Sequence, residues 1–213
     1  MATYDLDEQE RLDELKAWWK RWGSMAMIGL AVVIAASAGW RYWQHRTLTQ
    51  SLEAAAVYEK LTQSLAANDA KAAREAGSML IEQYKGTAYA PRAAMLLAKL
   101  NVLGKDLKSA QAQLEWAVAN SKEPAVRDLA RLRLAGVLLD QKQYDAALKT
   151  LSATHSDAYA FRFHDAKGDV LLAQGKQAEA RAAYQAAFGK MQEDDPYRSI
   201  VELKLDALGG EAK

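Results

Sequence analysis

The sequence predicts an all-α protein in which one transmembrane helix precedes a soluble array of paired helices. Alanine, which has the highest intrinsic helix propensity, contributes 43 of the 213 residues, whereas proline contributes only 3. One long uncharged apolar stretch lies near the N-terminus, and the rest of the chain consists of amphipathic stretches separated by short breaks. A β-sandwich or β-barrel is excluded because these folds need more β-branched residues and turn formers.

The uncharged stretch runs from Trp22 to Trp40 and contains 19 residues between Arg21 and Arg41. As a helix it reaches about 28 Å, close to the hydrocarbon thickness of a bilayer. Five of the six tryptophans lie at or beside its two ends, as in the aromatic belts of membrane proteins. We therefore expect three segments, which are a cytoplasmic tail at residues 1–21, a transmembrane anchor at 22–43 and a periplasmic domain at 44–213.

The residues that flank the anchor favour this orientation over a cleaved signal peptide. Lys16, Lys20 and Arg21 lie on the N-terminal side, against Arg41 and Arg46 on the other, so the positive-inside rule places the N-terminus in the cytoplasm. A signal peptide would begin with a short basic region, but the first 21 residues contain six acids. The domain after the anchor is then expected to be exported.

One face of the anchor carries small residues. Ala31, Ala35 and Gly39 recur at intervals of four, which allows another transmembrane helix to approach closely. This spacing predicts a helix-packing face for a membrane partner.

The domain after the anchor has an internal repeat. Ala73, Ala110, Ala147 and Ala180 align at spacings of 37, 37 and 33 residues, close to the 34-residue tetratricopeptide period. Twelve positions before the last three alanines stand the small residues Ala98, Ala135 and Gly168. Four positions after them stand Leu114, Leu151 and Tyr184. The pattern predicts a tetratricopeptide-like solenoid.

The ends of the array depart from this pattern. The first unit has Leu61 at the small position and Gly77 at the large one, so it is either degenerate or a capping pair. A last helix from Pro196 to Leu208, with Asp195 as its N-cap, is expected to cover the C-terminal end.

Site chemistry is not expected. The chain lacks cysteine and has no phosphate-binding loop, nucleophile elbow, dinucleotide or H-E-x-x-H pattern. The nearly balanced charges, 28 basic against 27 acidic residues, leave no basic field for nucleic acid. We expect a protein that is not an enzyme, holds no cofactor or metal and takes no small-molecule substrate.

Function is therefore expected from surfaces, because a solenoid offers a concave groove for a peptide or protein. Candidate groove residues are charged or polar residues on the first helix of each pair. They are Arg92, Lys99, Asn101, Arg131, Arg133, Asp140, Lys167 and Asp169.

Two segments resemble a known family. The motif GWRYW at 39–43 closes the anchor, and RLRLAGVLLDQKQYDAALKTL lies at 131–151. Together with the acidic tail they resemble the ancillary SecYEG translocon subunits of Gram-negative bacteria over essentially the whole chain. The resemblance implies a single-pass inner-membrane protein with a cytoplasmic N-terminus and a tetratricopeptide-like periplasmic domain. It also implies association with SecYEG and with the periplasmic chaperone PpiD, and help in passing newly translocated proteins to periplasmic folding factors.

Without the resemblance, the residues alone predict only an anchored protein-binding solenoid. A scaffold for another envelope assembly, such as cytochrome maturation or outer-membrane protein insertion, remains the alternative.

Overall fold

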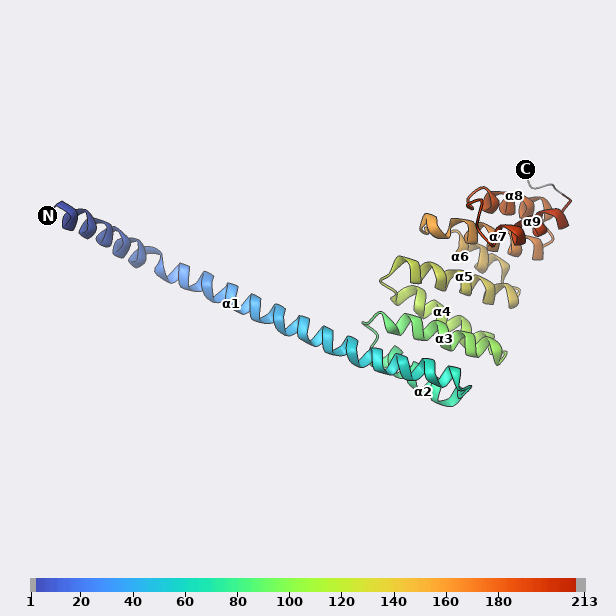
Figure 1. Ribbon diagram of the computed structural model, residues 1–213, viewed down its shortest axis with the longest axis horizontal. Helices are drawn as coiled ribbons and strands as arrows, with labels where there is room; N and C mark the ends of the chain where they lie inside the picture. Colours follow the sequence, from blue (N-terminus) through green and yellow to red (C-terminus); the bar gives the residue numbers. More distant parts are fainter. Residues whose placement is uncertain (1–2, 210–213) are drawn as a thin grey trace. The chain divides into compact units, whose positions relative to one another are not determined.

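The computed structural model describes residues 3–209, and within this range it is all-α, as the sequence predicts (Figure 1). It divides after Thr49 into two units. Residues 1–2 of the expected tail and 210–213 of the expected periplasmic domain lie outside the described residues. The helices are α1 (Thr3–Ala66), α2 (Ala70–Gln83), α3 (Tyr89–Leu103), α4 (Leu107–Asn120), α5 (Pro124–Asp140), α6 (Tyr144–Leu151), α7 (Ala160–Ala173), α8 (Gln177–Phe188) and α9 (Arg198–Ala207), with a short 3-10 turn at Asp157–Tyr159.

Helix α1 contains the apolar stretch that the sequence marks as an anchor. Among the described residues it is the single helix long and apolar enough to cross a bilayer. Large apolar side chains between Trp22 and Trp43, such as Met25, Ile28 and Val33, are exposed along it. The helix continues past the predicted anchor to Ala66 because residues 44–66 contain neither glycine nor proline.

The unit that begins at Gln50 stacks its helices in chain order (Figure 1). The end of α1 pairs with α2, and the pairs α3–α4, α5–α6 and α7–α8 follow. Side chains from successive pairs form three buried clusters, of which the largest joins α3 to α7. The alanines that define the predicted repeat, Ala73, Ala110, Ala147 and Ala180, are all completely buried.

The turn inside each pair repeats the same backbone geometry. Asn68, Lys105, Lys142 and Gly175 all have positive φ, between 57° and 77°, and they recur at the spacing of the buried alanines. In each turn the N–H of this residue donates to the carbonyl three residues earlier, and the next N–H donates to the carbonyl five residues before itself. These two bonds make a Schellman motif, which ends one helix and directs the chain into the next.

The two helix-capping aspartates follow the first two of these turns. Asp69 and Asp106 accept hydrogen bonds from the backbone N–H groups of Ala72 and Ser109, both at 3.0 Å. The bonds from Ser109 lower the pKa of Asp106, because they favour the charged carboxylate. Gln143 and Lys176 occupy the same position in the later turns without a side-chain cap.

The first pair is an integral part of the stack, although its residue sizes are reversed. Leu61 and Gly77 are both buried, and a Cβ added at Gly77 would lie 2.7 Å from Leu97 Cδ1 on α3. The glycine makes room for a leucine of the next pair. In this pair the small residue is therefore on the second helix and the large residue is on the first, and the interior is still closely packed.

Helix α9 covers the end of the stack through Val201 and Leu205, which are packed with Tyr184 and Ala187 of α8. Its expected start is corrected by the structure. The helix begins at Arg198, and Asp195 accepts from the Tyr197 N–H at 2.8 Å in the preceding turn. Asp195 thus caps a turn and not the helix, because Pro196 and Tyr197 intervene.

Candidate protein-binding groove

The first helices of the pairs place equivalent residues on the same side of the stack. Counted back from the positive-φ residue of each pair, positions at equal distances are equivalent. Six positions back stand Lys99, Gly136 and Asp169, and thirteen positions back stand Arg92, Leu129 and Arg162. The period therefore places residues of α3, α5 and α7 in common registers along one face.

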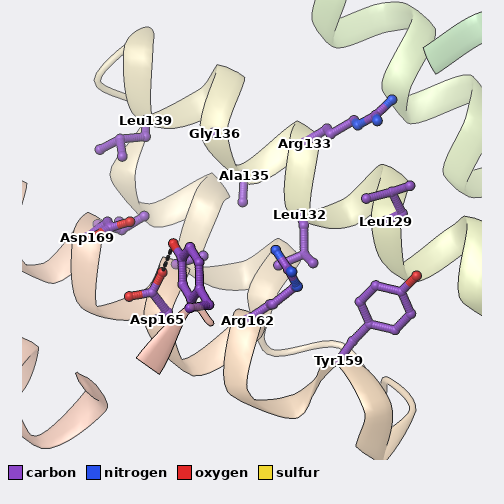
Figure 2. A pocket seen from close by; sticks show the side chains of 13 residues that line it. Leu129, Leu132, Arg133, Ala135, Gly136, Leu139, Tyr159, Arg162, Asp165 and Asp169 are labelled. Atoms are coloured by element: carbon purple, nitrogen blue, oxygen red, sulfur yellow. Dashed lines mark hydrogen bonds between the residues drawn. The ribbon is translucent and has the colours of Figure 1, made fainter. Parts of the chain in front are cut away.

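A groove of about 560 Å³ lies on this face between α5 and α7 (Figure 2). Tyr197, which lies between α8 and α9 in the chain, also lines it. This volume is within the range of peptide and ligand sites in proteins. The lining residues are Leu129, Leu132, Arg133, Ala135, Gly136, Leu139, Tyr159, Arg162, Asp165, Ala166, Asp169, Val170 and Tyr197. Most of them are apolar, so the groove has an apolar floor with a few charged groups along it.

Gly136 is the position at which α5 is open to the groove. It lies in the interior of the helix and is exposed, and a Cβ built on it would meet no atom within 4 Å. Neither a turn nor a close intramolecular contact requires a glycine here. Its effect is to leave space above the α5 backbone that the equivalent residues, Lys99 and Asp169, fill with side chains.

Two exposed arginines supply positive charge. Arg162 reaches from α7 toward α5, and Arg133 stands on α5 at the edge of the groove (Figure 2). Within residues 10–209, neither guanidinium has a carboxylate within 4 Å. Arg162 is placed by aromatic rings instead, with its Cζ 5.1 Å from the Phe161 centroid and 5.3 Å from that of Tyr197.

The other end of the groove carries two carboxylates that are already satisfied. Lys204 Nζ of α9 lies 2.8 Å from Asp165 Oδ1 and 2.7 Å from Asp169 Oδ1. Tyr197 donates to Asp165 at 2.9 Å, and Tyr184 donates to Asp169 at 2.8 Å. This network connects α7, α8 and α9 and so stabilises the C-terminal end of the stack.

The network changes the titration of its members. Burial and the hydrogen bond to Asp169 raise the pKa of Tyr184, and burial together with the charge of Asp165 raises that of Tyr197. Burial opposes the charge on Lys204, but its bonds to the two carboxylates outweigh this effect and raise the pKa of its ammonium group.

Two of the predicted groove residues hold the chain together. Arg92 forms a two-pronged pair with Glu123, at 2.8 and 2.6 Å, which connects α3 to the start of α5. This pair lowers the pKa of Glu123. Arg131 donates to the Thr154 carbonyl at 2.7 Å and pairs with the buried Asp128 at 3.3 Å, and so fixes the loop between α6 and α7.

The prediction for Asn101 is wrong. Its side chain is only 1% exposed and accepts a hydrogen bond from the Arg74 guanidinium of α2. The reason is its register, since Leu138 and Leu171 occupy the same position in the next pairs and are also buried. This position faces the interior of the stack, where Asn101 meets α2 of the preceding pair, and not the groove.

The other predicted residues are exposed, except for Asp169, which is half-buried. Arg133 and Asp169 line the groove described above, whereas Lys99 borders a separate hollow of about 400 Å³ with Leu65, Leu96 and Leu103. Asp140 and Lys167 are exposed but line neither space. Sequence reasoning missed Gly136 and Arg162. The repeat period could have identified them, because Gly136 is equivalent to Lys99 and Arg162 is equivalent to Arg92, and both of those residues were predicted.

The small face of the anchor, Ala31, Ala35 and Gly39, is exposed on α1, and a Cβ added at Gly39 would meet no atom within 4 Å. Its role as a membrane-helix contact stays a prediction.

The histidines lie outside the groove. His155 stacks on Phe163 with ring centroids 4.2 Å apart, and His164 is half-buried. Burial lowers the pKa of His164, and the neighbouring His155, Lys167 and Lys190 add to this effect. Within the described part of the chain, no three His, Asp or Glu side chains are grouped to hold a metal ion.

Comparison with known proteins agrees with the repeat architecture and adds a family. The family model for a tetratricopeptide repeat-like domain matches residues 16–210. Curated relatives named ancillary SecYEG translocon subunit match nearly the full chain. The protein from Neisseria gonorrhoeae is 32% identical over 98% of this chain and all of its own length, and that from Escherichia coli K12 is 28% identical over 98% and 99%.

The relative from Aggregatibacter actinomycetemcomitans is 30% identical over 87% of this chain and 90% of its own. No solved structure matches the chain significantly. The repeat-domain match covers the helical stack and part of α1, and the Neisseria relative extends the likeness to 98% of the chain. The chain therefore belongs to the family of ancillary SecYEG translocon subunits, with a tetratricopeptide repeat-like domain.

Proposed function

We propose that this protein is a non-enzymatic accessory subunit of the Sec translocon. Its helical stack binds partner proteins and helps to pass translocated proteins to periplasmic chaperones. The observation that carries the proposal is the likeness to ancillary SecYEG translocon subunits along nearly the whole chain, anchor included. The groove between α5 and α7 supports it, because an apolar floor with exposed charges is suited to protein binding.

In this proposal the two units have separate tasks. The apolar stretch of α1 spans the inner membrane with the N-terminus in the cytoplasm, and the Ala31, Ala35 and Gly39 face packs against a transmembrane helix of SecYEG. The unit from Gln50 lies in the periplasm, where its groove contacts a chaperone such as PpiD. Binding through two sites on one chain raises the effective concentration of each partner near the other.

In-cell photo-crosslinking tests this division. A photoreactive amino acid is placed at Ala35 in the anchor or at Ala166 in the groove, with Ala112 on the exposed side of α4 as the matched control. We expect Ala35 to crosslink to SecYEG subunits, Ala166 to a periplasmic chaperone, and Ala112 to neither. Crosslinks from Ala166 to cytosolic proteins would mean that the orientation in the membrane is the reverse of the proposed one. Crosslinks to haem-maturation or outer-membrane assembly factors in place of Sec components would refute the translocon assignment.

A further inference from the structure

We propose that the groove between α5 and α7 recognises a segment of a partner protein in which a large aliphatic side chain is adjacent to a carboxylate. The aliphatic side chain lies over Gly136, and the carboxylate binds Arg133 and Arg162. This inference rests on the proposed function, because it assumes that the groove is the surface used for partner binding.

Gly136 determines where the aliphatic side chain lies. A glycine in an exposed helix interior costs about 1 kcal/mol relative to alanine. At Gly136 no positive φ and no internal contact offsets this cost. The backbone of α5 is therefore accessible at this point, and Leu132, Leu139 and Val170 line the space around it. An aliphatic side chain that enters here removes apolar surface of both partners from water.

The charge distribution of the groove determines which chemical group lies beside the aliphatic side chain. Asp165 and Asp169 at one end are compensated by Lys204 and by two tyrosine hydroxyls. Arg133 and Arg162 have no carboxylate partner within residues 10–209, so the uncompensated charge of the groove is positive. Arg162 is also held by Phe161 and Tyr197, which limits the side-chain entropy lost when it binds a carboxylate.

The test uses the full-length protein in lipid nanodiscs and a phage library of random twelve-residue peptides as the probe. Gly136→Leu fills the proposed space, and Arg133→Glu reverses one charge. The matched controls make the same types of change on the exposed side of α4, and they are Ala112→Leu and Lys108→Glu.

We expect the unaltered protein to enrich peptides that carry Leu, Ile or Val next to Asp or Glu. Gly136→Leu should reduce binding of the enriched peptides by about tenfold or more. Arg133→Glu should remove the preference for acidic residues. The α4 controls should behave like the unaltered protein.

Misfolding does not account for the expected loss. Because Gly136 lies in a helix interior, Gly136→Leu and the smaller Gly136→Ala should raise the thermal midpoint by about 2–4 °C. A gain in stability together with a loss of binding is specific to a blocked groove.

Three outcomes would overturn the proposal. These are no enrichment over empty nanodiscs, enrichment of basic peptides, or enrichment that Gly136→Leu leaves unchanged. Co-purification of SecYEG with each variant is measured in parallel. If SecYEG does not co-purify with the unaltered protein, the proposed function is refuted. If SecYEG co-purifies but the groove shows no peptide preference, only the proposed recognition of an aliphatic side chain beside a carboxylate is refuted.

Discussion

Gly168 and Gly136 have opposite roles, although both lie in helix interiors. Gly168 of α7 is buried, and an added Cβ would overlap the ring of Tyr184, which is itself completely buried and hydrogen-bonded to Asp169. The ring cannot move without loss of this bond and of the packing between α7 and α8. At Gly136 of α5 an added Cβ meets open space.

This contrast predicts opposite effects of one substitution. Gly168→Ala should lower the free energy of unfolding by about 1–3 kcal/mol, because it overpacks the interface between α7 and α8. Gly136→Ala should raise it by about 1 kcal/mol, because alanine has the higher helix propensity. Urea unfolding followed by circular dichroism measures both. Equal effects of the two changes would mean that the Tyr184 contact does not constrain Gly168.

The network around Lys204 predicts an alkaline limit of stability. The folded state raises the pKa values of Tyr184, Tyr197 and Lys204 above those of the unfolded chain, which are about 10 for tyrosine and about 10.4 for lysine. A group with a raised pKa contributes its full stabilisation below the unfolded value. It loses this contribution as the pH rises toward the folded value. The thermal midpoint should therefore fall from about pH 10 upward.

Tyr197→Phe provides the check on this assignment. The variant loses the hydrogen bond to Asp165, so it should be less stable than the unaltered protein at pH 8. It also lacks one of the three titrating groups, so its thermal midpoint should fall less steeply above pH 10. Tyr89→Phe, outside the network, is the control and should keep the original slope. An unchanged slope for Tyr197→Phe would exclude Tyr197 as a source of the alkaline loss.

At the scale of the helix pair, the four Schellman turns place different residues at the position of positive φ. Gly175 adopts it at no steric cost, and asparagine tolerates it, but Lys105 and Lys142 place a Cβ against the backbone. A lysine in this conformation costs about 1–2 kcal/mol. Substitution by glycine removes this steric cost, but the net gain in stability is smaller, because glycine loses more conformational entropy on folding.

We therefore expect Lys142→Gly to stabilise the fold by about 0.5–1 kcal/mol, and Gly175→Lys to destabilise it by a similar amount. Lys149→Gly, the same substitution within α6, is the control and should be destabilising. Chemical denaturation of the three variants distinguishes the two environments. If Lys142→Gly destabilised the protein as Lys149→Gly does, the left-handed geometry of the turn would be refuted.

The turns also explain how much could be predicted at this scale. Short breaks between the amphipathic stretches lie at residues 67–69, 104–106, 141–143 and 174–176 of the sequence, and each contains one of the four turns. What the sequence did not reveal is which face each polar residue takes. Asn101 is polar and lies on a first helix, as groove residues do, but its register turns it toward Arg74 and the core. Register within the helix, and not polarity, decides burial.

At the scale of the whole molecule, the boundary between anchor and repeat domain was the least predictable feature. Charge and tryptophan placement locate the apolar stretch, but residues 44–66 contain no proline or glycine, and α1 runs on to Ala66. The last part of α1 is the first helix of the repeat stack. Ala54 and Leu61 are completely buried there, in one cluster with Leu80 of α2 and Leu97 of α3.

This double use of α1 predicts that the repeat domain depends on the C-terminal end of the helix that also contains the anchor. A fragment from Gln50 to Lys213 should melt cooperatively, because it keeps the cluster intact. A fragment from Asn68 loses Ala54 and Leu61 and uncovers Leu80 and Leu97, and burial of one leucine stabilises a fold by about 1.5–3 kcal/mol. Its thermal midpoint, measured by circular dichroism, should be lower by several degrees. Equal midpoints for the two fragments would mean that α2 closes the stack unaided and that the end of α1 only connects it to the membrane.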